Sequence, residues 1–413
     1  MKLDLSHKTI SEIINGEVLQ IIDEQIDLLY YDSRKINTKR KSAFFAFHGR
    51  HKDGHPYCEN AYKKGVRCFI VSKEIQLPSD CTIIKVEDTL YAYQEIAKYH
   101  RTQFNIPVLA ITGSFGKTTI KEWLYYLLKD HYNICRTPNS YNSQIGVAQS
   151  LLELNEQHEL AIFEADISHP DEMERLEEII SPTLGLFTGI GSHYAENFES
   201  QNHHLDEHLK LFTGVNTTLI LNSNKSDFRR RKINHIETSS EEWSAFITYQ
   251  DQFPTNKALC LKTAEFLGLT QNEIIQKWTS LPILSGRQEV FEGINNNLII
   301  NDTYNIDIDA LEQSLEYQFS SKERSIKIVV LNLFQVSTTR KKQIVELVER
   351  YKPDEFYILN NEDEVPVKLE QTRDALILFK GSFKSNLSNL VQKFKNRKHE
   401  TWVEFDIKSI LHN

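Results

Sequence analysis

Residues 113–119, with the sequence GSFGKTT, have the spacing best suited to phosphate chemistry. They follow an apolar stretch and precede an amphipathic one, so we predict a strand, a glycine turn and a helix. Backbone N–H groups of such a turn attract an anion, and its lysine and threonine suit nucleotide phosphates and Mg²⁺. The strict spacing of the common phosphate loop fails at Ile111, which leaves a plain helix-capping turn as the alternative. The candidate nucleotide-binding residues here are Gly113, Ser114, Gly116, Lys117, Thr118 and Thr119, and the loop alone does not choose between a kinase, a GTPase, an ATPase and a ligase.

Thr118 and Glu164 are the candidate metal ligands. Glu164 ends the apolar stretch 160–164, and ligands bind beyond the carboxyl ends of parallel strands. The alternative is a strand-end glutamate on the surface. His203, His204 and His208 also suggest a metal site, but no HExxH motif or partnering cysteine accompanies them. We therefore interpret them as surface histidines.

The elements that must position these residues alternate along the chain. Apolar stretches of strand length are separated by stretches of helical period, which is typical of parallel α/β sheets. The expected strands are 68–71, 108–112, 160–165, 184–190, 218–222, 297–302, 326–332, 355–359 and 375–379. Expected helices include 118–130, 170–180 and 339–351.

Two breaks in this alternation indicate domain boundaries. The polar stretch 100–105 precedes Pro107, and the segment LPILSG at 281–286 separates a helical stretch from a new pair of strands. We predict three domains at 1–104, 105–285 and 286–399, with a different segment at 400–413.

Composition excludes several classes of protein. The chain has 413 residues, 40% apolar and 25% charged, which fits a multidomain soluble protein. No apolar run approaches the length of a membrane-spanning helix, and a net charge of -9 offers no field for nucleic acid. Five scattered cysteines without a CxxC motif favour a reducing, cytoplasmic location over a disulfide framework.

Several motifs in order resemble those of the Mur ligases. The loop TGSFGKTT is followed by TPNSYNSQIG, LAIFEADIS and PTLGLFTGIG. Near the N-terminus, YDSRKI and GRHKDGH are similar to the UDP-sugar-binding domain of that family. Late in the chain, GRQEVFEG, INDTYNID and LFKGS are similar to its C-terminal domain. The resemblance covers about residues 5 to 395 and is strongest to the members that act on D-alanyl-D-alanine.

This resemblance implies a three-domain α/β fold. A UDP-sugar-binding domain would be followed by a central P-loop ATPase domain and a Rossmann-like C-terminal domain. It implies an ATP- and Mg²⁺-dependent, ADP-forming ligase of peptidoglycan precursor synthesis. Such an enzyme joins D-alanyl-D-alanine to UDP-N-acetylmuramoyl-tripeptide through an acyl phosphate.

The resemblance also assigns residues. Lys117, Glu164 and Lys210 would be catalytic, with Lys210 carbamylated to bridge a second metal; a solvated helix lysine is the alternative for Lys210. Nucleotide contacts would come from Arg287, Asp302 and Asn305. Substrate contacts would come from Ser33, Arg34, Asp53, Gly54, His55 and Asn142, the last of which could also be a plain turn asparagine.

Departures from the family pattern leave two other functions open. Phe115 replaces an asparagine of the loop, Asp166 replaces a common glycine, and Phe383 replaces an arginine after the KGS motif. The segment between Asn222 and Pro254 is also short. One alternative is a degenerate nucleotide- or UDP-sugar-binding domain with little ligase activity. A folylpolyglutamate-type ligase is the other, and the DSR and DGH motifs argue against it.

The last residues, ETWVEFDIKSILHN at 400–413, are similar to the beginning of an alanine racemase. We therefore expect the chain to be the ligase half of a ligase–racemase fusion, with the racemase domain missing. No racemase activity is expected from these 413 residues.

Overall fold

A computed structural model describes residues 3–22, 24–36, 41–49, 52–192, 194–214, 218–222, 235–239, 241–244, 253–278, 280–360 and 365–396. The racemase-like segment 400–413 lies outside these residues. The contacts divide the chain into two compact units. The first comprises 1–247 and 254–281, and the second comprises 248–253 and 282–413.

The first unit begins with a five-stranded sheet in the order β2-β9-β8-β5-β4. Strands β4, β5, β8 and β9 are parallel, and β2 is antiparallel to β9. Its strands are β2 (Glu17–Gln20), β4 (Leu28–Tyr30), β5 (Ser42–Phe45), β8 (Cys68–Val71) and β9 (Thr82–Lys85). Two short pairs accompany it, β1 (Leu5–Ser6) with β3 (Gln25–Ile26) and β6 (His48–Gly49) with β7 (Lys52–Asp53). The helices are α1 (His7–Ile13), α2 (Cys58–Lys63) and α3 (Thr89–Thr102), with 3₁₀ turns η1 (Ser33–Lys35) and η2 (His55–Tyr57).

A second sheet of the same unit has six parallel strands in the order β11-β12-β10-β13-β14-β15. They are β10 (Val108–Thr112), β11 (Ile134–Arg136), β12 (Leu160–Glu164), β13 (Leu184–Phe187), β14 (Thr218–Asn222) and β15 (His235–Thr238). The helices are α4 (Lys117–Leu128), α5 (Gln144–Leu151), α6 (Glu172–Ile180), α7 (Gln201–Leu209), α8 (Pro254–Phe266) and α9 (Gln271–Trp278), with η3 (Ala195–Asn197) and η4 (Lys210–Phe212). The chain leaves β10 first towards β11 and β12 and then towards β13, so strand order reverses at β10. Ligands of open α/β sheets bind at such a point.

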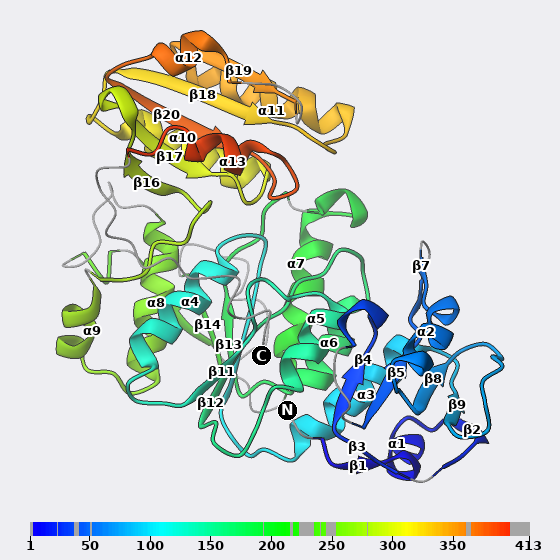
Figure 1. Ribbon diagram of the computed structural model, residues 1–413. Coiled ribbons are helices and arrows are strands. Elements are labelled where there is room, and N and C mark those ends of the chain that lie inside the picture. The colour runs from blue at the N-terminus through cyan, green and yellow to red at the C-terminus, as the bar shows by residue number, and fades with distance from the viewer. Residues whose placement is uncertain are drawn as a thin grey trace. The chain divides into compact units, whose positions relative to one another are not determined.

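One hydrophobic core joins the two sheets of the first unit. Helix α3 packs against α5 and α6 (Figure 1), and the buried cluster runs from Ile10 through Ile96 to Leu221. The sequence-based boundary at 104/105 therefore falls inside a continuous core, and the division into three domains stays a prediction.

The second unit contains a five-stranded sheet in the order β16-β17-β20-β18-β19, with only β16 antiparallel. Its strands are β16 (Glu289–Glu292), β17 (Leu298–Asp302), β18 (Ile326–Asn332), β19 (Glu355–Leu359) and β20 (Ala375–Lys380). The helices are α10 (Ile308–Ser320), α11 (Thr338–Tyr351), α12 (Val367–Gln371) and α13 (Leu387–Gln392), with η6 (Ile294–Asn296). Separate buried clusters line the two faces of this sheet.

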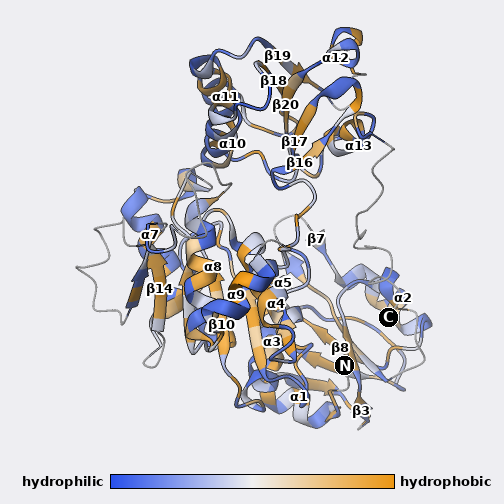
Figure 2. Cartoon of the chain, turned by 90° about the vertical axis from the view of Figure 1, so that its left-hand side faces the viewer, coloured by the Kyte–Doolittle hydropathy of each residue, from blue (hydrophilic) through white to orange (hydrophobic). Residues whose placement is uncertain are grey.

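The α/β class and the nine expected strands are confirmed. Hydrophobic residues gather in the strands (Figure 2), because parallel strands covered on both faces bury consecutive apolar side chains. All five cysteines are buried and free. Within the described part of the chain, no helix combines the length and apolarity needed to cross a bilayer.

Candidate active site

The predicted strand–turn–helix is formed by β10, residues 113–116 and α4. Gly113 and Gly116 adopt positive φ values of 128° and 81°. A Cβ atom on Gly113 would lie 2.4 Å from Thr188 Oγ1, and one on Gly116 would lie 2.4 Å from Asn256 Nδ2. Both positions therefore require glycine, and Asn256 of α8 borders the turn from a position that sequence reasoning did not assign.

The turn is braced by the segment that follows β13. The Ser114 N–H donates to Gly189 O at 2.8 Å, and the Gly191 N–H donates to Ser114 Oγ at 2.8 Å. Thr188 Oγ1 donates to Phe115 O at 2.5 Å. These hydrogen bonds preorganise the turn through contacts within the protein.

Lys117, Thr118 and Thr119 are buried in the first turn of α4. The Lys117 ammonium donates to Gly113 O at 2.5 Å and lies 3.0 Å from Asp166 Oδ2. Thr118 Oγ1 lies 2.9 Å from Ser140 Oγ. The positive end of α4 and the Lys117 ammonium, whose charge Asp166 balances here, together form a cradle that suits phosphate.

Glu164 ends β12 beside this cradle. It is fully buried and pairs in register with Ile111, and its N–H donates to Thr137 Oγ1 at 3.0 Å. Hydroxyl and carboxylate oxygens are the ligands that Mg²⁺ prefers. The donor chemistry of Thr118 and Glu164, beside a cradle shaped for phosphate, thus fits a Mg²⁺–nucleotide.

A third segment, residues 137–143, is fastened to the same edge of the sheet. The fully buried Lys121 of α4 donates to Thr137 O at 2.6 Å and to Asn139 O. Asn142 O accepts from the Asp166 N–H at 2.9 Å. Lys121 was missed by sequence reasoning; its place one turn after Lys117 is the signal that could have found it.

The interpretation of His204 and His208 as surface residues is wrong. Both are only 1% exposed. His208 Nδ1 lies 2.8 Å from Thr112 Oγ1 at the end of β10, and His208 Nε2 lies 3.2 Å from His204 Nε2. The ring of His204 stacks on Phe198 at 4.2 Å. Side chains of the buried face of α7 thus form a hydrogen-bonded chain that reaches Thr112, the residue before the phosphate turn.

Lys210 follows α7 and lies among carboxylates. Its ammonium is 2.7 Å from Glu207, 2.9 Å from Glu174 and 3.4 Å from Asp171. The Glu207 hydrogen bond is the main cause of a raised Lys210 pKa. Carbamylation needs the neutral amine, which this environment disfavours. The catalytic and metal-bridging role of Lys210 stays a prediction.

The expected UDP-sugar residues follow parallel strands of the N-terminal sheet. Ser33 is buried after β4, and Lys64 Nζ donates to its carbonyl at 2.7 Å. Arg34, with its side chain 88% exposed, donates to both oxygens of Asp32 at 2.9 and 2.8 Å. This pairing lowers the pKa of Asp32 to about 2.

The DGH segment begins in β7 and forms a hydrogen-bonded network. His55 Nδ1 lies 2.5 Å from Asp53 Oδ1, and His55 Nε2 accepts from the Ser72 N–H at 3.0 Å. Lys73 Nζ donates to Asp53 Oδ2 at 2.9 Å, which lowers the Asp53 pKa. A Cβ on Gly54 would lie 2.9 Å from the Ala46 carbonyl carbon, so glycine is required. His48, Asp53 and His55 are close enough to share an ion, but the His55 nitrogens already have protein partners.

Within the second unit, Arg287 precedes β16, Asp302 ends β17 and Asn305 follows β17. Arg287 lies over the Tyr304 ring at 3.9 Å, and Tyr304 stacks on the exposed Phe383 at 5.6 Å. The Asp302 carboxylate accepts from the buried Lys380 at 2.5 Å and from Ser314 at 2.6 Å. Asn305 is partly buried, three residues after Asp302, the last residue of β17.

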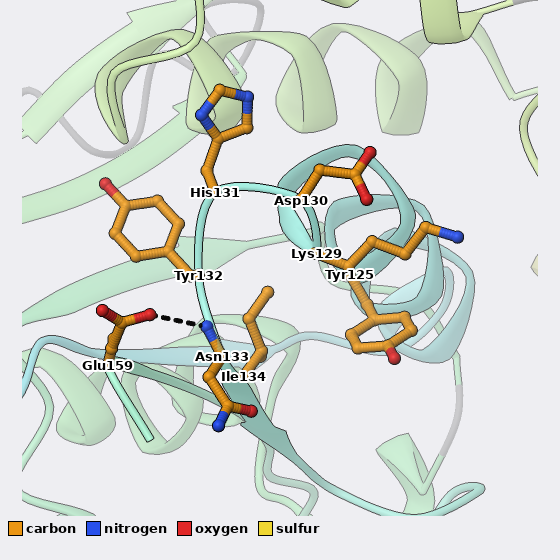
Figure 3. A pocket seen from close by; sticks show the side chains of 8 residues that line it. All are labelled: Tyr125, Lys129, Asp130, His131, Tyr132, Asn133, Ile134 and Glu159. Carbon is orange, nitrogen blue, oxygen red and sulfur yellow. Dashed lines mark hydrogen bonds between the residues drawn. The ribbon is translucent and has the colours of Figure 1, made fainter. Parts of the chain in front are cut away.

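A cavity of about 360 Å³ lies at the opposite end of α4 (Figure 3). Lys129, His131 and Ile134 line it, at the end where β11 begins. His131 is 3.2 Å from Glu273, and the Asn133 N–H donates to Glu159 at 2.9 Å. Because this is the amino edge of the sheet, the cavity is separate from the phosphate turn.

Comparison with known proteins agrees with this geometry. Residues 111–263 match the Mur ligase middle domain. The chain is 22% identical over 355 residues to a UDP-N-acetylmuramoyl-tripeptide–D-alanyl-D-alanine ligase of Bacillus subtilis, covering 78% of this chain and 77% of that protein.

Solved structures show the same fold. A crystal structure of MurF from Acinetobacter baumannii matches with a TM-score of 0.80 at 18% identity, covering 94% of this chain and 98% of the other. A MurF ligase of Thermotoga maritima in complex with ADP matches with a TM-score of 0.75 at 22% identity, covering 89% and 96%. A P-loop on a parallel sheet defines a nucleotide-binding α/β protein. Residues 111–263 match the middle domain of the Mur ligases, and the chain as a whole has the fold of the solved MurF structures.

Proposed function

We propose that this chain is an ATP-dependent, ADP-forming ligase that adds D-alanyl-D-alanine to UDP-N-acetylmuramoyl-tripeptide. The observation that carries the proposal is the preorganised turn 113–116, with Lys117, Thr118 and Glu164 at one edge of the sheet. The relatives named above support the choice of substrates.

The chemistry begins with transfer of the terminal phosphoryl group of ATP to the tripeptide carboxylate. Backbone N–H groups of the turn and the N-terminus of α4 would hold the phosphates. The Lys117 ammonium would lie against the transferred group, where negative charge develops. Thr118 and Glu164 would hold Mg²⁺, which neutralises phosphate charge when bound.

The second half of the reaction needs an amine close to the acyl phosphate. The amine of D-alanyl-D-alanine attacks the acyl carbon, and phosphate leaves as the amide bond forms. The segments 137–143 and 188–191 border the phosphate turn, and Asn142 is the residue there that we assign to substrate.

UDP binding is assigned to the N-terminal sheet. Ser33 and Arg34 follow β4, and the Asp53–His55 network follows β5. Exposed guanidinium and lysine groups at this edge suit a diphosphate. In the second unit, the proposed contacts with ATP are Arg287, Asp302 and Asn305.

The test measures phosphate release from ATP and Mg²⁺, with each substrate alone and with both together. We expect release to require both substrates and to accompany formation of the UDP-pentapeptide. Binding of ATP or the UDP-sugar without any release would favour the degenerate-domain alternative. Release with a folate and glutamate would favour the folylpolyglutamate alternative.

A further inference from the structure

Asp166 forms an ion pair with the Lys117 ammonium. Its Oδ2 atom lies 3.0 Å from Lys117 Nζ, and the two side chains are 14% and 7% exposed. The same ammonium donates to Gly113 O at 2.5 Å. The lysine side chain therefore points back onto its own loop, where the Asp166 carboxylate balances its positive charge.

The position of Asp166 is built into the backbone around it. Its Oδ1 accepts from the Ile167 N–H at 3.1 Å, so one oxygen is held while the other faces Lys117. Its own N–H donates to Asn142 O at 2.9 Å. The carboxylate is therefore fixed at the end of β12, two residues beyond Glu164.

We propose that Asp166 is a positioning residue that holds Lys117 until nucleotide phosphates displace it, and that this competition sets the affinity for polyphosphate. The proposal rests on the proposed function only in that the turn binds the phosphates of ATP. A fixed carboxylate at this place repels incoming phosphates, and partial burial strengthens that repulsion. The lysine must exchange one anion for another, which weakens binding compared with a lysine that has no such counter-ion.

A different role for Asp166 makes the opposite prediction. If its carboxylate bound Mg²⁺ together with Thr118 and Glu164, removing the charge would weaken nucleotide binding, and only when Mg²⁺ is present. If it were only a structural cap for Ile167, an asparagine would serve equally well and affinity would not change.

The test is Asp166→Asn in the full chain, with affinities for inorganic tripolyphosphate, ADP and AMP measured by titration calorimetry with and without Mg²⁺. We expect tripolyphosphate and ADP to bind about tenfold more tightly, because the change removes the competing charge and keeps the Ile167 contact. The affinity for AMP should change less than about twofold. Asp130→Asn is the matched control, since Asp130 is 62% exposed at the far end of α4 and pairs with Lys277 at 2.8 Å.

Unchanged or weaker binding of tripolyphosphate in a folded Asp166→Asn variant would overturn the proposal, and weakening confined to Mg²⁺ would make Asp166 a metal ligand. If that variant fails to fold, Asp166→Ser, which retains an acceptor for Ile167, carries the same expectation. In the complete reaction KM for ATP should fall while KM for the other substrates stays constant. Absence of ligation with the affinity change intact would count against the proposed function and leave this inference standing.

Discussion

Lys117 is the residue on which nucleotide chemistry depends most directly. Its ammonium is buried at the first turn of α4, hydrogen-bonded to Gly113 O and paired with Asp166. Without it, phosphates bound in the turn would lose a nearby cation, while the turn would keep the hydrogen bonds of Ser114 with Gly191 and of Thr188 with Phe115.

We therefore expect Lys117→Ala to lower the rate of substrate-dependent phosphate release by about 10²- to 10³-fold, as loss of one preorganised charge-stabilising donor does. Phosphate release and circular dichroism measure activity and fold. Lys129→Ala is the control, because Lys129 lies over the Tyr126 ring at the other end of α4. Undiminished release by the Lys117 variant would refute its assignment.

At the scale of elements, α4 does more than present its N-terminus. Lys121 is fully buried and connects the helix to the backbone of 137–139, the segment that leads to Ser140 and Asn142. One helix thus positions both the phosphate turn and the neighbouring loop.

Lys121→Met should lower the free energy of unfolding by roughly 1–3 kcal/mol, because two carbonyl groups lose a buried charged donor. It should also raise KM for the UDP-tripeptide, since Asn142 lies on the loosened segment. Urea unfolding and initial rates measure the two effects. Lys63→Met is the matched control, because Lys63 is 68% exposed on α2; equal effects of both substitutions would contradict the role of Lys121.

The contact of α6 with α7 is reinforced by Lys210 and three carboxylates. Because the Lys210 pKa is raised in the folded chain, its stabilising effect should be complete below the ordinary value of 10.5. It should be lost as the pH rises through the folded value. The difference in unfolding free energy between the chain and Lys210→Met should therefore be constant from about pH 7 to 10 and shrink above that.

Urea unfolding over this pH range measures that difference, with Lys342→Met of the exposed α11 surface as control. Because Lys210 stays protonated, it should not be carbamylated, and activity should not depend on added bicarbonate. Activity that rises with bicarbonate would support a carbamylated Lys210 instead.

At the scale of the whole molecule, the two units have separate hydrophobic cores. Each is large enough to unfold cooperatively, so calorimetry should resolve two transitions. Tripolyphosphate, for which the turn of the first unit is the proposed site, should raise the midpoint of one transition. A single transition that shifts as a whole would contradict this expectation.

Sequence alone determined the features that depend on neighbouring residues. The strand–turn–helix at 108–128 could be predicted because glycines, a lysine and flanking apolar periodicity lie within one short segment. The strand expected at 326–332 matches β18, and the one expected at 355–359 matches β19, because buried parallel strands consist of consecutive apolar residues.

Only the tertiary structure decided which distant groups meet. Asp166 pairs with Lys117 across 49 positions of chain because β12 lies beside β10 in the sheet. His204 and His208 are buried because the face of α7 that carries them packs towards Thr112 and Phe198, while Lys210 lies among carboxylates of α6 and α7. Burial and charge pairing depend on long-range packing, and the local pattern of a single helix contains no information about its partner.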